Sequence, residues 1–334
     1  MTVAEPDLRR LAVALLRGRG ASASTAWLQA DLLIEAELRG LPSHGVQRLP
    51  RLLMRIDRGL ADPNATGSHH WCNRSFLKVD GKRALGPVAL MLALEALVPA
   101  TKDAGIALAA INNANHIGML AYYAEAAATR GMIGIVLSTS EALVHPFGGT
   151  QAMLGTNPIA IGIPTGDVPF VLDLASSLVS MGKIHNHALR GKALPPGWAV
   201  DAAGLPTTEA EAAKTGAIAP FGEAKGYGLG LAFELMVAML AGSELAPDVR
   251  GTLDATHPAN KGDLLILIDP GLDNAMASRV AAYLEALRGS RAANPAFPVS
   301  VPGDRMRARR ALAQREGINV PDSLMNELQA LLAA

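Results

Sequence analysis

A histidine and an arginine stand four residues apart in the segment Leu41-Pro-Ser-His-Gly-Val-Gln-Arg48. Histidine titrates near neutral pH and suits proton transfer, whereas arginine can bind a carboxylate through two parallel hydrogen bonds. If a helix begins at Ser43, His44 and Arg48 lie on one face of it. This pair is typical of a site for a small acid that gains or loses a proton. The alternative is a capping serine followed by a surface histidine and a surface arginine.

Two further segments place polar groups next to apolar runs. Asn112-Asn-Ala-Asn-His-Ile-Gly118 contains His116, which could belong to a site on a rigid scaffold or lie in a turn of the kind that asparagines favour. Asp173 lies within the apolar run 170–174, and a buried carboxylate is costly unless it has a partner. It could orient a histidine, accept a hydrogen bond from a ligand hydroxyl, or cap the end of a strand.

The Gly- and Pro-rich segment Pro146–Pro158 separates two apolar runs that are typical of buried strands. Ordered loops on a rigid scaffold often carry function, and glycines let backbone amides approach a ligand closely. The segment is therefore either a ligand-binding loop or a structural crossover.

Several common motifs are missing. The sequence has no G-x-G-x-x-G, and the glycines of Gly226-Tyr-Gly-Leu-Gly230 have the wrong spacing for a Rossmann dinucleotide loop. A Walker A motif, H-E-x-x-H and G-x-S-x-G are absent too, which disfavours a P-loop enzyme, a zincin and an α/β-hydrolase. No metal site is expected, because Cys72 is the single cysteine and no carboxylate stands at ligand spacing from His185 and His187.

The composition favours a globular protein that binds neither nucleic acid nor membranes. Thirty basic and thirty acidic residues give a formal net charge of zero, without the basic excess that such partners require. We find no apolar run long enough to span a bilayer, and Arg17 and Arg19 interrupt the first apolar stretch, which argues against a signal peptide. A cytoplasmic location is expected. A chain of 334 residues favours two domains, or one domain with a large subdomain.

Apolar periodicity predicts helices at both ends of the chain and alternating strands and helices between them. The predicted helices are 8–16, 22–39, 43–59, 87–102, 119–130, 225–240, 274–287, 305–316 and 322–332. The predicted strands are 75–79 and 82–85, paired about Asp80-Gly81, and 105–111, 132–138, 159–164, 170–174 and 263–269. Segments 60–74 and 248–262 have the composition of linkers. We therefore expect a mixed α/β middle between helical ends.

An ordered series of motifs resembles the malate/L-lactate dehydrogenase family that is unrelated to the Rossmann-type lactate and malate dehydrogenases. That family includes ureidoglycolate dehydrogenase, diketogulonate reductase, sulfolactate dehydrogenase and the piperideine-2-carboxylate/pyrroline-2-carboxylate reductases. The matching motifs, in family order, are S-H-G-V-x-R at 43–48, N-x-x-H-I-G at 113–118, P-F-G-G at 146–149, G-T-N-P at 155–158, D-L-A-S-S at 173–177, G-K at 182–183, P-x-G-W-A-x-D at 195–201, G-L-P-T-T at 204–208, P-F-G-x-x-K-G-Y-G-L at 220–229 and P-G-D at 302–304.

The resemblance implies a nicotinamide-dependent oxidoreductase with an α/β fold of its own. A largely antiparallel mixed sheet would bind the dinucleotide, and the chain termini would form a helical domain. The corresponding domains are 1–70 with 305–334 for the helical domain and 71–304 for the α/β domain. The family also implies a homodimer with NAD or NADP as cofactor, and the residues leave the choice between these two open.

By the same match, His44 would exchange a proton with the substrate carbonyl or imine, His116 would be the alternative acid/base, and Asp173 would support the proton-transfer group. The substrate-binding residues implied are Ser43, Arg48, Met153, Thr156 and Asn157. The implied cofactor contacts are Ser138, Thr139, Ser140, Leu174, Ala175, Ser176, Lys183, Ala224, Lys225, Gly303, Asp304 and Arg305.

The expected reaction is hydride transfer between nicotinamide and C2 of a small 2-oxo or 2-hydroxy acid. Glu223 replaces a family glycine, and Leu52 stands where many relatives have tyrosine. Together with 175–177 and 220–222, Leu52 favours an alternative, the reduction of a cyclic 2-imino acid to an L-amino acid. A non-catalytic ligand-binding relative is the third interpretation, which the retained His44, Arg48, His116 and Asp173 disfavour.

Overall fold

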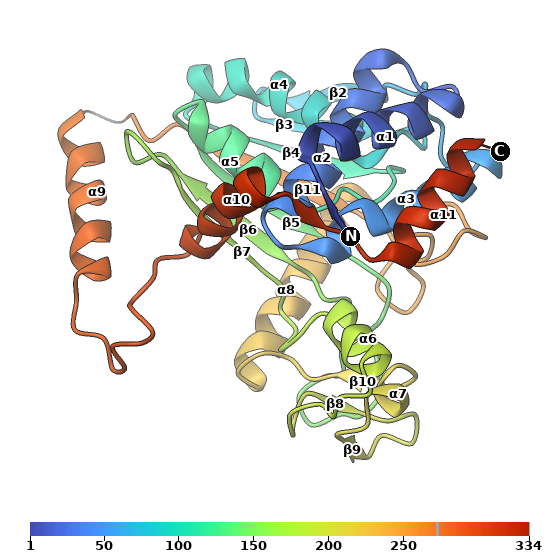
Figure 1. Cartoon of the computed structure of the whole chain (residues 1–334). Coiled ribbons are helices and arrows are strands. Elements are labelled where there is room, and N and C mark those ends of the chain that lie inside the picture. The colour runs from blue at the N-terminus through green and yellow to red at the C-terminus, as the bar shows by residue number, and fades with distance from the viewer. Residues whose placement is uncertain (272–273, 334) are drawn as a thin grey trace.

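A computed structural model describes residues 1–271 and 274–333 of the chain. A seven-stranded sheet with the order β2-β3-β4-β11-β5-β6-β7 lies at its centre (Figure 1). Only β3 and β4 are parallel in this sheet, so the expected largely antiparallel mixed sheet is confirmed. The strands are β2 (Ser68–Asn73), β3 (Phe76–Asp80), β4 (Ile106–Asn112), β5 (Ile133–Ser138), β6 (Ile159–Ile163), β7 (Phe170–Leu174) and β11 (Asp263–Ile268).

Helices surround this sheet and form both ends of the chain. They are α1 (Glu5–Gly18), α2 (Ala23–Leu38), α3 (Leu49–Asp57), α4 (Gly86–Ala104), α5 (Ala121–Thr129), α6 (Met181–Leu189), α7 (Ala210–Ala213), α8 (Ala224–Ala241), α9 (Asn274–Arg288), α10 (Asp304–Glu316) and α11 (Asp322–Ala333).

The sheet is covered by helices on both faces. Successive side chains of a strand point to opposite faces. Ala109 and Leu265 lie in one core cluster with residues of α4 and α5, whereas their neighbours Ala110 and Leu264 lie in another with residues of α8. Burial on both faces explains why these strands read as continuous apolar runs rather than as alternating ones.

The two ends of the chain share one core. Buried side chains of α1, α2 and α3 pack with those of α11, and the short strands β1 (Thr2–Val3) and β12 (Ile318–Asn319) pair with each other. Leu85, just before α4, belongs to the same cluster. The domain boundaries at residues 70 and 305 stay a prediction.

A third cluster lies in a lobe that Figure 1 shows below the central sheet. It combines α6 and α7 with a three-stranded sheet of β8 (Ala199–Val200), β9 (Pro206–Thr207) and β10 (Ala217–Ile218). Ile184 of α6 is fully buried in this lobe. The lobe brings the start of α6 to the turn that carries His44, as the site geometry below describes.

The predicted hairpin about Asp80-Gly81 is wrong. Strands β2 and β3 pair with each other instead, so the segment 60–74 is not merely a linker. Lys82 and Arg83 have φ angles of 49° and 62°, in the left-handed region, so the chain turns there and cannot continue as a strand.

The expectation that no apolar run could span a bilayer is also corrected. By length and composition, helix α8 is long and apolar enough to cross a membrane. Yet its Glu234 is buried, and the carboxylate of Glu234 accepts hydrogen bonds from the side chain of Asn157 and the backbone of Ala246. Val237 and Ala241 pack against the sheet. These contacts make α8 a helix of this fold.

Candidate active site

His44 lies in a double turn rather than in the predicted helix 43–59. Two 3-10 turns, Pro42–His44 and Val46–Arg48, flank Gly45, which has an extended backbone, and α3 begins only at Leu49. A Cβ at Gly45 would overlap the carboxylate of Glu37 in α2. That carboxylate accepts a hydrogen bond of 2.8 Å from the backbone N–H of Val46. Close packing on Glu37 therefore breaks the helix and fixes the turn.

Ser43, His44 and Arg48 nevertheless come together. The Ser43 hydroxyl lies 3.0 Å from His44 Nδ1, and Arg48 Nε donates a hydrogen bond of 2.8 Å to the Ser43 carbonyl. A Cβ at Gly182 would lie 3.0 Å from the Cβ of Ser43, so the first turn of α6 packs closely against Ser43. The structure thus joins the predicted acid/base and the predicted carboxylate-binding arginine without a shared helix face.

His116 faces His44 from a different part of the chain. Their ring centroids are 5.7 Å apart, at an interplanar angle of 33°. His116 Nδ1 accepts a hydrogen bond of 3.0 Å from the backbone N–H of Gly118, so Nδ1 carries no proton and Nε2 is the protonated nitrogen of the neutral ring. This bond fixes both the tautomer and the orientation of the imidazole.

Both imidazoles are neutral at pH 7. Burial, reinforced by the charge of Arg48, lowers the pKa of His44 to about 4. Burial lowers the pKa of His116 well below its ordinary value, and the charges of Arg48 and Arg51 add to that effect. Neutral imidazoles can accept a proton from an alcohol, and an anion bound beside Arg48 would raise their pKa values.

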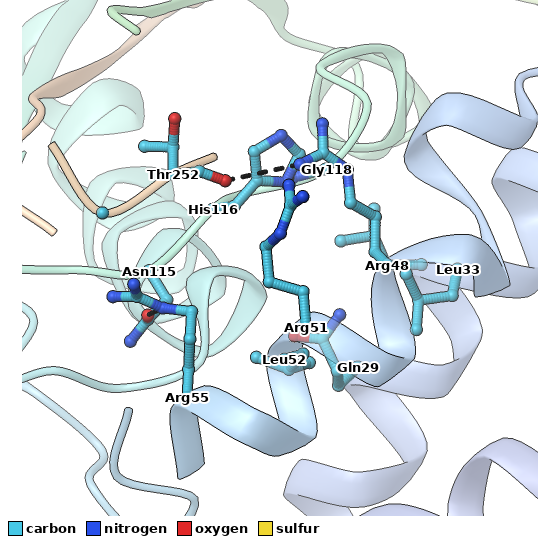
Figure 2. Close-up of a pocket in the computed structure, with 12 residues that line it drawn as sticks. Gln29, Leu33, Arg48, Arg51, Leu52, Arg55, Asn115, His116, Gly118 and Thr252 are labelled. Atoms are coloured by element: carbon cyan, nitrogen blue, oxygen red, sulfur yellow. Dashed lines mark hydrogen bonds between the residues drawn. The ribbon is translucent and has the colours of Figure 1, made fainter. Parts of the chain in front are cut away.

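A pocket opens beside His116 (Figure 2). In Figure 2 the side chains of Arg48 and Arg51 reach toward the imidazole, whereas Arg55 turns toward Asn115. The pocket combines apolar walls with three guanidinium groups. Among the described residues no aspartate or glutamate lines it, but the carboxylate charges of Asp254 and Glu141 act on Arg55 from outside the lining. Its lining residues are Gln29, Leu32, Leu33, Arg48, Arg51, Leu52, Arg55, Asn115, His116, Gly118, Gly251 and Thr252.

Arg48 is held at the edge of this pocket, and its Nη2 has no hydrogen-bond partner among the described residues. Its Nη1 donates to the Thr252 carbonyl at 3.4 Å, and the Thr252 loop is fixed by Glu141, which accepts 2.7 Å and 2.8 Å bonds from the backbone of Thr252 and Leu253. Burial and the charge of Arg51 lower the pKa of Arg48 to about 10, so it stays cationic at neutral pH. Arg48 would therefore offer a substrate carboxylate a desolvated cation of fixed orientation.

The sequence motifs did not point to Arg51, Arg55 or the Thr252 loop. The arginines at 48, 51 and 55 follow helical spacing, and this pattern could have identified the two that were overlooked. Thr252 lies in the linker-like segment 248–262, and nothing in that composition indicates that its backbone would border a pocket.

Asp173 stands in β7 and accepts a 2.8 Å hydrogen bond from the backbone N–H of Ala121, the first residue of α5. Burial raises the pKa of its carboxyl to about 6. In the described part of the chain, no hydrogen bond joins Asp173 to His44 or His116. It holds the start of the helix that follows His116, so any support of proton transfer is indirect.

Three predicted cofactor- and substrate-binding segments meet at Thr156. Its backbone N–H donates to the Ser140 hydroxyl at 3.1 Å, and its carbonyl accepts from the hydroxyl and the N–H of Ser176 at 2.9 Å and 2.8 Å. The next residue, Asn157, has φ of 32°, and its buried Oδ1 has no hydrogen-bond partner among the described residues. Contact of these groups with a nicotinamide nucleotide stays a prediction.

The remaining predicted residues divide into two groups, and their ligand contacts stay predictions. Some already have polar partners within the protein: Ser138 donates to Asp263 at 2.6 Å, and Asp304 forms an ion pair with Arg288 at 2.8 Å. Thr139 Oγ1 accepts from the Gly262 N–H. The others are exposed or partly buried, namely Met153, Leu174, Ala175, Lys183, Ala224, Lys225, Gly303 and Arg305.

The chain is similar to known proteins over nearly all of its length. It is 34% identical over 327 residues to L-sulfolactate dehydrogenase of Methanocaldococcus jannaschii, which covers 97% of this chain and 94% of that one. It is also 34% identical to Delta(1)-pyrroline-2-carboxylate reductase 1 of Burkholderia ambifaria, covering 98% and 96% of the two chains.

A solved structure described as a dehydrogenase from Sinorhizobium meliloti is 64% identical, with a TM-score of 0.96 over 99% of this chain and 98% of that one. The family profile described as malate/L-lactate dehydrogenase matches residues 3–329. The motifs, the sheet and these similarities agree, and the chain belongs to the malate/L-lactate dehydrogenase family, an oxidoreductase that acts next to a carboxylate.

Proposed function

We propose that this protein is an NAD- or NADP-dependent dehydrogenase that interconverts a small 2-oxo acid and its 2-hydroxy acid. The observation that carries the proposal is the pair of neutral imidazoles, 5.7 Å apart, beside a pocket lined by arginines. Oxidation of a 2-hydroxy acid needs a proton acceptor and a carboxylate-binding cation at one site, and this pocket offers both. The proposal includes a homodimer in the cytoplasm.

In the direction of oxidation, Arg48 binds the carboxylate and His44 accepts the hydroxyl proton as the C2–H bond breaks. A nicotinamide nucleotide, when bound, takes up that hydride or supplies it in the reverse direction. During reduction the imidazolium of His44 returns its proton to the carbonyl oxygen. The negative charge of the bound acid partly cancels that of Arg48, which raises the pKa of His44 toward the range useful for both directions.

His116 is the second candidate for the proton transfer. Its Nδ1 is committed to the Gly118 N–H, so Nε2 would have to exchange the proton. His44 is preferred because its Nδ1 partner is a hydroxyl, which can donate or accept as the ring changes protonation.

A cyclic 2-imino acid is the alternative substrate. The likeness to a pyrroline-2-carboxylate reductase and the apolar walls formed by Leu32, Leu33 and Leu52 favour it. In that reaction the same histidine would keep the imine nitrogen protonated. A non-catalytic ligand-binding role is disfavoured, because two adjacent imidazoles with lowered pKa values are typical of a proton-transfer site.

The test is a turnover assay. The purified protein is incubated with NADH or NADPH and, in turn, pyruvate, oxaloacetate, sulfopyruvate and piperideine-2-carboxylate, and cofactor oxidation is followed. Turnover of at least one 2-oxo acid is expected, and protection against heat by NAD or NADP would identify the preferred cofactor. Turnover of the imino acid alone would establish the alternative, and no turnover of any acid would overturn both.

A further inference from the structure

Helix α2 places one side-chain amide in an apolar wall of the pocket beside His116. Gln29, Leu32 and Leu33 are three and four residues apart, so they share one face of α2, and all three line the pocket. Leu52 of α3 lines it too, at the position where many relatives have tyrosine. In Figure 2 Gln29 and Leu52 project from these two helices, and His116 comes from the opposite side. Gln29 therefore interrupts this apolar wall with a neutral hydrogen-bonding group.

The amide of Gln29 has no partner within the described part of the protein. The residue is 4% exposed, and no described residue forms a hydrogen bond with its side chain. Its amide is not among the fully enclosed unpaired groups, so the small surface that it keeps opens on the pocket. The other amide of the lining differs, because Asn115 accepts from Arg55 at 3.0 Å and donates to the Arg83 carbonyl at 2.8 Å. A nearly buried polar group without a partner is costly, and a ligand would satisfy it.

The chemistry of an amide decides which group of a ligand fits there. The side chain of Gln29 offers donors on Nε2 and an acceptor on Oε1, and a hydroxyl or an amide of the ligand can pair with both. A carboxylate or sulfonate has acceptors only, so it would leave Oε1 unpaired and would bring its charge against the leucine side chains of the wall. A hydrocarbon chain or ring would leave the whole amide unpaired. The wall therefore fits an uncharged hydrogen-bonding group.

We infer that Gln29 determines specificity by binding an uncharged hydroxyl or amide group at the end of the substrate remote from its carboxylate. This inference rests on the proposed function, in which Arg48 holds the carboxylate and His44 exchanges the proton at C2. The preferred substrate is then a 2-hydroxy acid, or its 2-oxo form, with a neutral polar side chain. Acids with a distal anion and cyclic imino acids are poorer substrates, because neither pairs with both groups of the amide.

The experiment compares three 2-hydroxy acids of nearly equal shape, namely 2-hydroxysuccinamate, malate and 2-hydroxy-4-methylpentanoate. They differ only at the distal end, which carries an amide, a carboxylate or two methyl groups. Reduction of NAD or NADP gives kcat/KM for each acid in the wild type, in Gln29→Met and in the control Gln329→Met. Methionine keeps the approximate size of glutamine and removes the amide, and Gln329 is exposed on α11, outside the pocket. The midpoint of thermal unfolding is measured for all three proteins.

In the wild type, kcat/KM for 2-hydroxysuccinamate should exceed that for each other acid by about tenfold or more, because a site built to hydrogen-bond its substrate rejects analogues without that group. Gln29→Met should remove this preference by raising KM for 2-hydroxysuccinamate, without lowering the unfolding midpoint, and Gln329→Met should keep it. A wild type that prefers either other acid, or a preference that survives in Gln29→Met, would overturn the inference. An equal loss on all three acids with a lower unfolding midpoint would make the amide structural, which also overturns it.

A binding measurement separates failure of this inference from failure of the proposed function. If no acid is turned over, the proposed function fails, and calorimetric titration with succinamate, succinate and 4-methylpentanoate still tests the pocket. These three acids lack the reacting hydroxyl and keep the three distal groups. Tighter binding of succinamate that is lost in Gln29→Met would support the role of the amide, and equal binding of the three acids would refute it.

Discussion

His44 shows how a single residue can be prepared for chemistry by its surroundings. Its Nδ1 lies 3.0 Å from the Ser43 hydroxyl, its ring lies next to a second imidazole, and burial and Arg48 keep it neutral. The same arginine that would bind the substrate therefore also sets the basicity of the group that would move the proton. Substrate binding and proton transfer are coupled through one charge.

This coupling can be measured by NMR titration of the His44 ring. In the free protein we expect a midpoint well below 6.5, near 4, because the neutral form is favoured by burial and by Arg48. Arg48→Gln removes a positive charge and should raise the midpoint. A wild-type midpoint at or above 6.5 would refute this account of the site.

The sequence predicted His44, His116 and Arg48 because their motifs and residue types indicate chemistry directly. It could not predict that Glu37 packs behind Gly45, since that contact depends on how α2 meets the turn. The helical run expected from residue 43 is broken for the same reason. Local propensity favoured a helix, and a tertiary contact overrode it.

At the scale of elements, the turn between α2 and α3 positions the acid/base, and Gly45 makes its close approach possible. Gly45→Ala should displace the turn, lower kcat/KM at least tenfold and destabilise the fold by about 1–3 kcal/mol, as overpacking does. Gly18→Ala at the end of α1, where a Cβ would meet no atom within 4 Å, is the matched control. Urea unfolding and steady-state kinetics measure both effects, and equal behaviour of the two variants would contradict the role of Gly45.

Glu37 in α2 gives this turn a dependence on pH. Burial raises the pKa of its carboxyl to about 7, above the ordinary value of 4.5, so the folded protein holds this proton more tightly than the unfolded chain. The stability contributed by the protonated group is present below pH 4.5 and is lost as the pH rises to 7.

Glu37→Gln should therefore lower the free energy of unfolding less at pH 8 than at pH 5. Urea unfolding at the two pH values measures the difference, and exposed Glu316→Gln serves as the control. A larger loss of stability at pH 8 than at pH 5 would show that folding does not raise the pKa of Glu37.

Strands of the middle of the chain that are long apolar runs were well predicted, because 132–138 and 263–269 correspond to β5 and β11. The expected strand 82–85 is wrong, and β2, α6, α7 and β8–β10 were not predicted. Their neighbours in the sheet were not predictable. β11 pairs with β4 and β5 across more than a hundred residues, and no local pattern encodes that pairing.

At the scale of the whole molecule, α8 presents apolar side chains that the single chain does not cover. Leu229, Leu235 and Met236 are 46%, 46% and 36% exposed, and Met239 is 84% exposed. Exposed apolar surface of this kind is typical of an interface between protein chains. A second copy of the chain, as in the proposed homodimer, would bury it.

Sedimentation velocity at micromolar concentration tests this proposal. We expect twice the chain mass of 34.7 kDa, and Met239→Glu should shift the population toward the monomer by placing a charge in the interface. The control is Met54→Glu in α3, an exposed methionine away from α8. A wild-type monomer would contradict the homodimer.

The central claim is that hydride passes between nicotinamide and C2 of a 2-oxo acid while His44 transfers the proton. The most direct measurement uses NADH or NADPH deuterated at C4, in its two stereochemical forms, with oxaloacetate, sulfopyruvate or pyruvate, followed by NMR of the product. The account predicts deuterium at C2 from one form only, and at least a hundredfold slower transfer in folded His44→Ala. Hydrogen at C2 that comes from water instead, or an unchanged rate in His44→Ala, would contradict it.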